Sequence, residues 1–210
     1  MPPARSPYRP RKTPKQQRAW QTRERILAAA AHVFAEHGYA SGTTDRIAEH
    51  AGLSIGSLYQ YFPNKDAILV ALAGAHLDET ADTIRTHLAE ARSLREWLSA
   101  LTRALADLHA ANPRLHQVLF EQAPRPPDLV ARFHKAEAEA ESLVAELLRN
   151  DPATQVPDPA HAARFVVALV ESLIHRFTSS DPAELTEEIV TIVTRYLGDG
   201  HNMPDQATTN

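Results

Sequence analysis

"TTDRIAEHAGLSIGSLYQYF", residues 43–62, decides how the N-terminal part of the chain folds. It predicts two short helices joined by a tight turn. Thr43 or Thr44 can cap the first helix, because a threonine hydroxyl accepts a hydrogen bond from an amide of the first turn. Gly52 permits the positive φ of a tight turn, and Ser54 can cap the second helix.

The spacing of Ala48, Gly52 and Leu58 indicates a helix-turn-helix, in which a small residue lets the helices approach and leucine packs the second helix down. Leu58 and Phe62 lie on the same side of the second helix, which is therefore expected to be buried. The outward side of that helix consists of Ser54, Ile55, Gly56, Ser57, Tyr59, Gln60 and Tyr61.

This outward side suits a DNA major groove, since hydroxyls bind phosphates, glutamine can address base edges and glycine allows close approach. Residues 1–66 hold 10 Lys/Arg and 5 Asp/Glu, whereas residues 67–210 hold 12 and 21. A basic front on an acidic body indicates that the front alone meets a polyanion. From these residues, an ordinary helical hairpin with a polar exposed side stays open as the alternative.

Helical periodicity continues along the whole chain, and no stretch alternates with period two. The first helix is expected from about Arg18 to His37, with Gly38 as its stop. Later helices are predicted near 65–90, 94–111, 113–122, 128–149, 159–178 and 182–197. We therefore predict an all-α fold with a basic disordered arm at 1–17, a three-helix domain at 18–66, a helical body at 67–198 and a disordered tail at 199–210.

The last two expected helices are the most apolar ones in the chain. The segment "HAARFVVALVESLIHRF", residues 161–177, is apolar on most of its circumference. A helix of this kind must be covered on several sides. The pair can therefore lie in the core of one chain or in a dimer interface, and the pattern alone leaves both open.

Several function classes are disfavoured by what the sequence lacks. There is no cysteine, which excludes disulfides, thiolate metal sites and a cysteine nucleophile. The 11 histidines show no metal-ligand spacing, and no hydrolase, Rossmann or P-loop motif appears, so neither a metal site nor an enzyme is expected. Apolar runs are too short for a membrane span and no signal core is present, which favours a cytoplasmic protein. A helical adaptor whose basic front binds acidic proteins remains an alternative to a DNA-binding protein.

Residues 43–69 closely resemble the DNA-binding signature of the TetR family of transcriptional regulators. The matching features are Thr43-Thr44, Ile47-Ala48, Ala51-Gly52-Leu53, Ser54, Gly56-Ser57-Leu58-Tyr59, Tyr61-Phe62, Lys65-Asp66 and Leu69. The preceding helix also matches, so the resemblance covers about residues 20–72. It implies a helix-turn-helix regulator that binds double-stranded operator DNA as a homodimer and holds a small-molecule effector, of unknown identity, in its C-terminal helical domain.

The resemblance also assigns residues to the operator. Ile55, Gly56, Tyr59 and Gln60 would face bases, whereas Thr44, Ser57, Tyr61 and Lys65 would hold phosphates and Thr43 and Ser54 complete the site. Tyr59 could instead pack against the first helix. The arm residues Arg9, Arg11, Lys12 and Lys15 are candidates for further DNA contacts, or belong to a solubilising tail.

A dimer interface and an effector pocket follow from the same resemblance. The last two helices would form a four-helix bundle with a second copy, through Phe165, Leu169, Leu173, Ile189, Val193 and Tyr196. Candidate pocket residues, for each of which core packing or a surface position is the simpler explanation, are Trp97, His109, Phe120, Glu121, Phe133, His134, Glu171 and His175. Repression is the commoner mode of regulation in the family, and we therefore expect a repressor. The ligand is expected to favour a conformation of the helical body in which the helix at 65–90 swings, which releases the operator.

Overall fold

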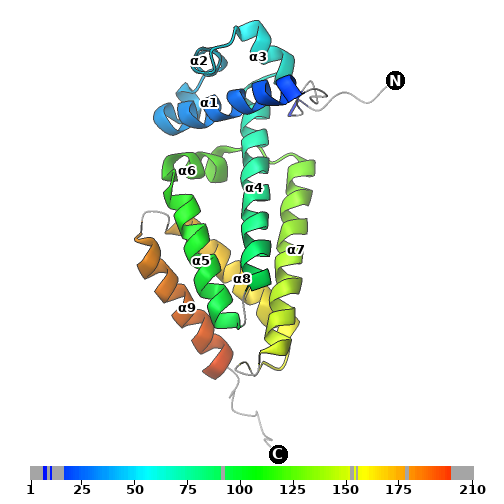
Figure 1. Ribbon diagram of the computed structural model, residues 1–210, viewed down its shortest axis with the longest axis vertical. Helices are drawn as coiled ribbons and strands as arrows, with labels where there is room; N and C mark the ends of the chain where they lie inside the picture. The colour runs from blue at the N-terminus through cyan, green and yellow to red at the C-terminus, as the bar shows by residue number, and fades with distance from the viewer. Residues whose placement is uncertain are drawn as a thin grey trace, which may run out of the picture. The chain divides into compact units, whose positions relative to one another are not determined.

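The computed structural model describes residues 7, 8, 10, 17–90, 93–151, 154, 156–177 and 180–199. All regular structure in these residues is helical, which confirms the all-α prediction. The helices, labelled in Figure 1, are α1 (Gln17–Ser41), α2 (Thr44–His50), α3 (Ile55–Tyr61), α4 (Lys65–Glu90), α5 (Leu94–Ala110), α6 (Pro113–Gln122), α7 (Pro127–Asn150), α8 (Pro159–Arg176) and α9 (Pro182–Asp199). None of these described helices is long and apolar enough to cross a membrane.

Side chains at the helix starts explain where the short N-terminal helices begin. The Thr43 hydroxyl accepts a hydrogen bond from the amide of Arg46, and the Ser54 hydroxyl accepts one from the amide of Ser57. The Asn64 side chain caps α4 in the same way, with its oxygen 2.8 Å from the amide nitrogen of Ala67. Each capping side chain accepts a hydrogen bond from an amide that the helix itself leaves without a partner. The starts of these three helices are therefore fixed by local interactions.

The chain forms two compact units. The N-terminal unit comprises residues 1–79 and 112–133, and the C-terminal unit comprises residues 80–111 and 134–210. This division differs from the expected one after residue 66, because the first part of α4, all of α6 and the start of α7 belong to the N-terminal unit. The boundary therefore falls inside α4 and α7, where helical periodicity gives no signal of a domain border.

The core of the N-terminal unit explains this grouping. The fully buried residues Phe34 of α1, Ile47 of α2, Leu58 of α3 and Leu69 of α4 belong to one cluster, together with the buried Val118 of α6. In addition, α6 packs along α1. Burial of these side chains is the main stabilising contribution to the unit, at about 1.5–3 kcal/mol for each large one.

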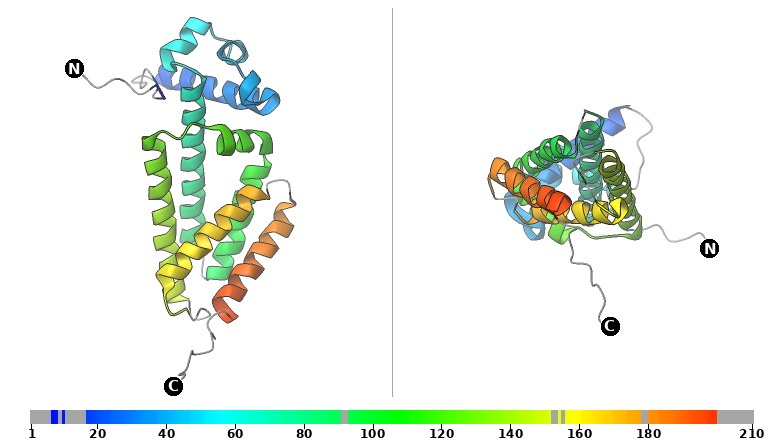
Figure 2. Two further views of the ribbon diagram at one scale, coloured as in Figure 1. Left: turned by 180° about the vertical axis from the view of Figure 1, so that it is seen from behind. Right: turned by 90° about the horizontal axis from the view of Figure 1, so that it is seen from below.

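The core of the C-terminal unit is built around α5. In Figures 1 and 2, α8 and α9 run beside α5, in agreement with the packing of the three helices on one another. Leu98 of α5, Val166 of α8, and Ile189 and Val193 of α9 are almost entirely buried in this cluster. The three helices thus bury their apolar faces within a single chain.

Candidate nucleic-acid interface

The turn between α2 and α3 is held by the backbone and by an arginine of α1. Gly52 adopts a φ of 63°, as expected for the tight turn, and the amide of Leu53 donates a hydrogen bond to the carbonyl oxygen of Ala48 at 2.9 Å. The Arg25 guanidinium donates to the carbonyl oxygen of Ala51 at 2.5 Å. These bonds fix the angle at which α3 leaves α2. The role of Arg25 could not be predicted from the sequence, because this residue is 26 positions away from Ala51.

Two buried anchors set which side of α3 faces outward. Leu58 and Phe62 are fully buried, as predicted. The opposite side of α3 exposes Gly56 and Gln60, and large fractions of Ile55 (37%) and Tyr59 (38%). The structure therefore presents the residues expected to face bases on one accessible surface.

Hydroxyl groups link the two helices at this surface. The hydroxyls of Thr44 and Tyr59 lie 3.1 Å apart, which joins α3 to the start of α2. The hydroxyls of Ser54 and Ser57 lie 2.8 Å apart at the start of α3. Tyr59 is thus positioned by a contact with α2, and four of the expected operator residues form two hydrogen-bonded pairs.

Lys65 and Tyr61 lie at the edge of this surface. The Lys65 ammonium donates to the carbonyl oxygens of Tyr39, at 2.9 Å, and Ala40, at 3.4 Å. Tyr61 is half-buried and packs against the N-terminal core. An ammonium has three N–H donors, so Lys65 retains one after these two bonds.

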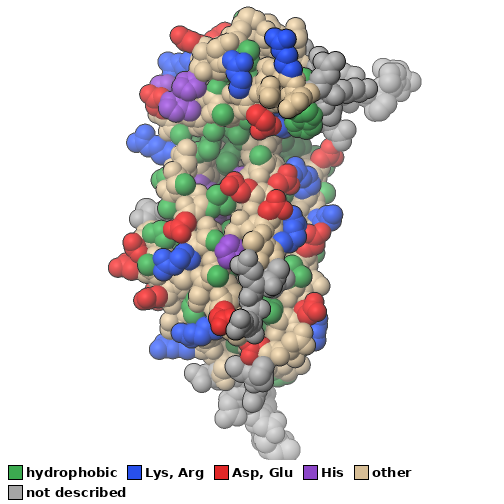
Figure 3. Space-filling model, in the orientation of Figure 1, with side chains coloured by type: hydrophobic (Ala, Val, Ile, Leu, Met, Phe, Trp, Pro, Cys, Tyr) green, Lys and Arg blue, Asp and Glu red, His purple; other side chains and the backbone are tan. Residues whose placement is uncertain are grey.

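Arg46 was not singled out from the sequence, but the structure exposes it on the first turn of α2. Its guanidinium lies 3.4 Å from the carbonyl oxygen of Ser41. In Figure 3 the surface over α2 and α3 is largely uncharged, with Lys and Arg side chains among the polar groups. The signal that could have identified Arg46 is a basic residue three positions after the Thr43 cap.

The arm residues Arg9, Arg11, Lys12 and Lys15 lie outside the described residues, as does the tail after residue 199.

The expected effector residues are divided between the two units. Phe120, Glu121 and Phe133 belong to the N-terminal unit, where the Arg125 guanidinium lies 5.7 Å from the Phe120 ring centre and 5.9 Å from that of Phe133. Trp97 is buried in the C-terminal core, and His134 is exposed.

Three effector candidates do meet within the C-terminal unit. The rings of His109 and His175 stack with centres 5.0 Å apart, and His175 Nε2 lies 3.9 Å from the Glu171 carboxylate. The predicted proximity of Glu171 and His175 is therefore found, on the last turns of α8. The four-residue spacing of Glu171 and His175 predicts that they lie together on one helix. The approach of His109 from α5 could not be predicted from the sequence, because it depends on how α5 packs against α8.

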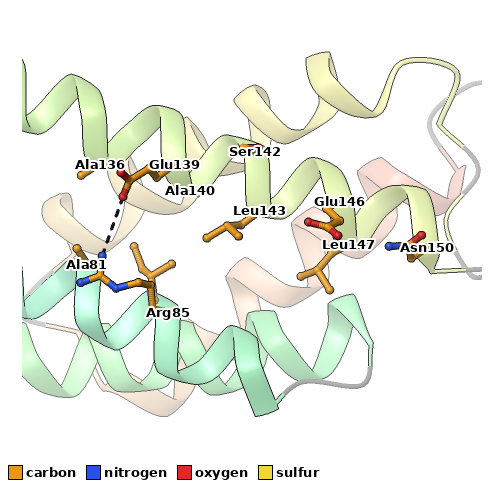
Figure 4. Close-up of a pocket in the computed structure, with 11 residues that line it drawn as sticks. Ala81, Arg85, Ala136, Glu139, Ala140, Ser142, Leu143, Glu146, Leu147 and Asn150 are labelled. Atoms are coloured by element: carbon orange, nitrogen blue, oxygen red, sulfur yellow. Dashed lines mark ion pairs between the residues drawn. The ribbon is translucent and has the colours of Figure 1, made fainter.

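An open groove lies between α4 and α7 of the C-terminal unit (Figure 4). Its volume is about 680 Å³. The apolar part of its lining consists of Ala81, Ile84, Ala136, Ala140, Leu143 and Leu147. The Arg85 guanidinium lies 4.0 Å from the Glu139 carboxylate across the groove. None of the eight candidates named from the sequence lines it, because sequence spacing does not reveal which helix faces leave a space between them.

The expected dimer residues separate into two groups. Ile189 and Val193 are completely buried in the core of one chain, so the expectation that they meet a partner is wrong. Phe165 is 51% exposed and its ring centre lies 4.9 Å from that of Tyr196, while Leu169 and Leu173 are half-buried. Ile192, which is 42% exposed on α9, was missed.

Two family models match the chain. One is described as bacterial regulatory proteins of the tetR family and matches residues 26–72. The other is described as the tetracyclin repressor-like C-terminal domain and matches residues 93–197, which is half of the chain. Together they cover the helix-turn-helix and most of the helices that follow it.

Individual relatives agree with these models. The transcriptional activator FasR of Mycolicibacterium smegmatis is 28% identical over 145 residues, which are 69% of this chain and 64% of FasR. The fatty acid metabolism regulator protein of Bacillus subtilis is 32% identical over 74 residues, or 35% of this chain and 38% of that protein. The chain thus spans less than two thirds of the length of these relatives.

A solved structure also matches over most of its length. The transcriptional regulator SCO7518 from Streptomyces coelicolor A3(2) is 28% identical, with a TM-score of 0.62, over 83% of this chain and 99% of that one. The two family models and these three proteins are described as regulators and not as enzymes.

Proposed function

Because the chain belongs to the TetR family of bacterial regulatory proteins, we propose that it is a ligand-responsive transcriptional repressor acting on DNA in the cytoplasm. In this proposal a dimer binds a palindromic operator through the N-terminal units. A small molecule that binds the C-terminal unit then favours a conformation that releases the operator. Residues 18–66 would bind DNA, together with the first part of α4, all of α6 and the start of α7, and the rest of the predicted body at 67–198 would bind the ligand.

The outward side of α3 is the observation that carries the proposal. Leu58 holds the helix down, while Gly56 leaves open space and Tyr59 and Gln60 extend from the same side. A short helix with this surface fits the major groove, where glutamine can address the edge of a base pair. We assign Ser57, Thr44 and the remaining N–H of Lys65 to phosphate contacts beside this helix.

A dimer is needed because one short helix contacts few base pairs. A two-fold symmetric pair binds two half-sites about 34 Å apart, and its interface uses the same patch on both copies. We assign that patch to apolar residues of α8 and α9, namely the exposed Phe165 and Ile192 and the half-buried Leu169, Leu173 and Tyr196. Isolated exposed apolar residues are common, but a group of this size on two adjacent helices favours an interface.

We assign the ligand to the groove between α4 and α7. Its apolar lining suits a hydrocarbon chain, and an anionic group on the ligand could displace Glu139 from Arg85. The name of the Bacillus subtilis relative suggests fatty acyl compounds as the first class to test. Since α4 follows α3 after a short connection and its first part belongs to the N-terminal unit, a change at Ile84 or Arg85 would act on a helix that continues into the unit that presents α3.

An electrophoretic shift with the DNA that flanks the protein's own coding region tests the DNA-binding function. We expect a sequence-selective shift at moderate salt with competitor DNA present, and its absence would refute the proposal. A reporter gene controlled by the same DNA distinguishes a repressor from an activator. If the protein is a repressor, as we propose, deletion of its gene should raise expression of the reporter.

Binding of acyl-CoA thioesters of increasing chain length to the full chain tests the ligand assignment. Leu143→Trp should fill the groove and abolish binding, and Arg85→Gln should weaken it. Arg149→Gln is the matched control, because Arg149 is an exposed arginine of α7 that does not line the groove. Equal binding by the Leu143 variant would show that the ligand binds elsewhere.

A further inference from the structure

Two histidines from different helices of the N-terminal unit meet side by side. His76 of α4 and His116 of α6 have ring centres 5.4 Å apart, with their planes at 76°. Each offers a metal-ligating nitrogen, and these nitrogens lie within 4.8 Å of one another. The edge-to-face arrangement lets a lone pair in the plane of one ring point toward a site beside the other.

The surroundings keep these rings in place. His116 is buried and His76 is half-buried, and the Phe120 ring stacks on His116 with centres 6.3 Å apart and planes at 9°. Burial lowers the pKa of His76 below its ordinary value, against the opposite effect of the nearby Glu79 carboxylate.

We propose that His76 and His116 bind a divalent transition-metal ion of the zinc class and thereby fix α6 against α4. Imidazole nitrogens suit zinc, copper and nickel ions. Bonds of about 2.0–2.1 Å place two nitrogens of a tetrahedral zinc site roughly 3.3 Å apart, so only a small rotation of the two rings is required. The other coordination positions are filled by water or by further donor groups.

The position of His76 and His116 means that an ion bound by them would affect the N-terminal unit. On one side, α4 starts three residues after Phe62, which anchors the end of α3. On the other side, α6 packs along α1, and its Val118 shares a core with Phe34. An ion held by both helices would therefore stiffen the unit that presents α3, and we expect the metal to raise its thermal stability.

The test is a titration of the metal-stripped full chain with Zn²⁺ alone, followed by competition with a chromophoric chelator. We expect one ion per chain, and at least tenfold weaker binding in His76→Gln and in His116→Gln. His161→Gln is the control, because His161 is exposed on α8 of the C-terminal unit and should leave the affinity unchanged. Circular dichroism of each variant establishes that it is folded.

Two results would overturn the inference. Unchanged zinc affinity in both variants would exclude these residues as ligands, and equal losses in the His161 control would indicate unspecific binding to surface imidazoles. A Zn²⁺-dependent rise in melting temperature that disappears in both variants would support the link between α4 and α6. Because these measurements need no DNA, their outcome is independent of the operator-binding test.

Discussion

The side-chain ammonium of Lys65 lies 2.9 Å from the main-chain carbonyl oxygen of Tyr39 and 4.2 Å from the centre of the Tyr39 ring. The Tyr39 hydroxyl in turn donates a hydrogen bond to the Asp66 carboxylate. The first turn of α4 is thereby tied to the end of α1, where carbonyl groups carry partial negative charge. Lys65 thus has a structural role in addition to the phosphate contact that we propose for it.

Replacing Lys65 by alanine should therefore change two measurable quantities. The free energy of unfolding should fall by about 1 kcal/mol, since the bonds to the carbonyl oxygens of Tyr39 and Ala40 are lost. Operator affinity should fall for all sequences alike, and the slope of log K against log salt should decrease in magnitude by about one. Chemical denaturation and salt-dependent shift assays measure the two effects separately.

Gln60→Ala is the matched comparison, because Gln60 is exposed on α3 and is assigned to a base edge. It should leave stability and the salt slope unchanged but relax the preference for one base pair, at a cost of about 1–3 kcal/mol. If the Gln60 variant lost affinity uniformly across sequences, the division between base and phosphate contacts would be wrong.

Gly56→Ala should separate stability from DNA binding. A Cβ atom at this position would have nothing within 4 Å, and alanine favours a helix over glycine by about 0.5–1 kcal/mol, so the melting temperature should rise. The added methyl group would occupy space between α3 and the floor of the DNA major groove. Operator affinity should therefore fall by about tenfold or more. A variant that is more stable and binds as tightly as the parent would place Gly56 outside the contact surface.

The helix boundaries were readable from the sequence because their determinants are local. The predicted helices 65–90 and 113–122 coincide with α4 and α6, each of which follows a capping asparagine. Gly52 adopts a positive φ, as a tight turn requires, and the positive φ of Gly38 interrupts the helical backbone within α1, which continues to Ser41 and not, as expected, only to His37. The buried side of α3 was equally predictable, since a four-residue spacing of apolar side chains identifies one face of a helix.

The partners of the helix faces were not readable in the same way. Ile189 and Val193 lie on an apolar stripe, but periodicity does not say whether α5 of the same chain or a second chain covers it. The same limit applies to His76 and His116, which are 40 residues apart and approach only through the packing of α4 and α6. The groove between α4 and α7 is a further case, because it depends on the distance between two helix axes.

Gly42→Ala should destabilise the N-terminal unit. A Cβ atom there would lie 2.5 Å from Cδ1 and 2.8 Å from Cε1 of Phe34, whose ring is fully buried and has little room to move. Overpacking of this kind costs about 1–3 kcal/mol, which denaturant unfolding of the variant would measure.

Gly198→Ala is the control for this substitution, because a Cβ atom in that part of α9 meets nothing within 4 Å. The double variant Phe34→Leu/Gly42→Ala should lose less stability than the sum of the two single variants, since leucine leaves room for the methyl group. Simple additivity would contradict the contact between position 42 and the ring.

The proposed dimer patch can be tested by placing charge on its two most exposed members. The double variant Phe165→Glu/Ile192→Glu should fold normally, because these side chains are 51% and 42% exposed in the single chain, yet it should sediment as a monomer. Burying unpaired charges in an apolar interface costs several kcal/mol, which exceeds what most single contacts contribute. Operator binding should then weaken steeply, since each monomer reaches only one half-site. Trp20→Arg, at a position 47% exposed on α1, should remain dimeric, and a double variant that also remained dimeric would exclude this patch as the interface.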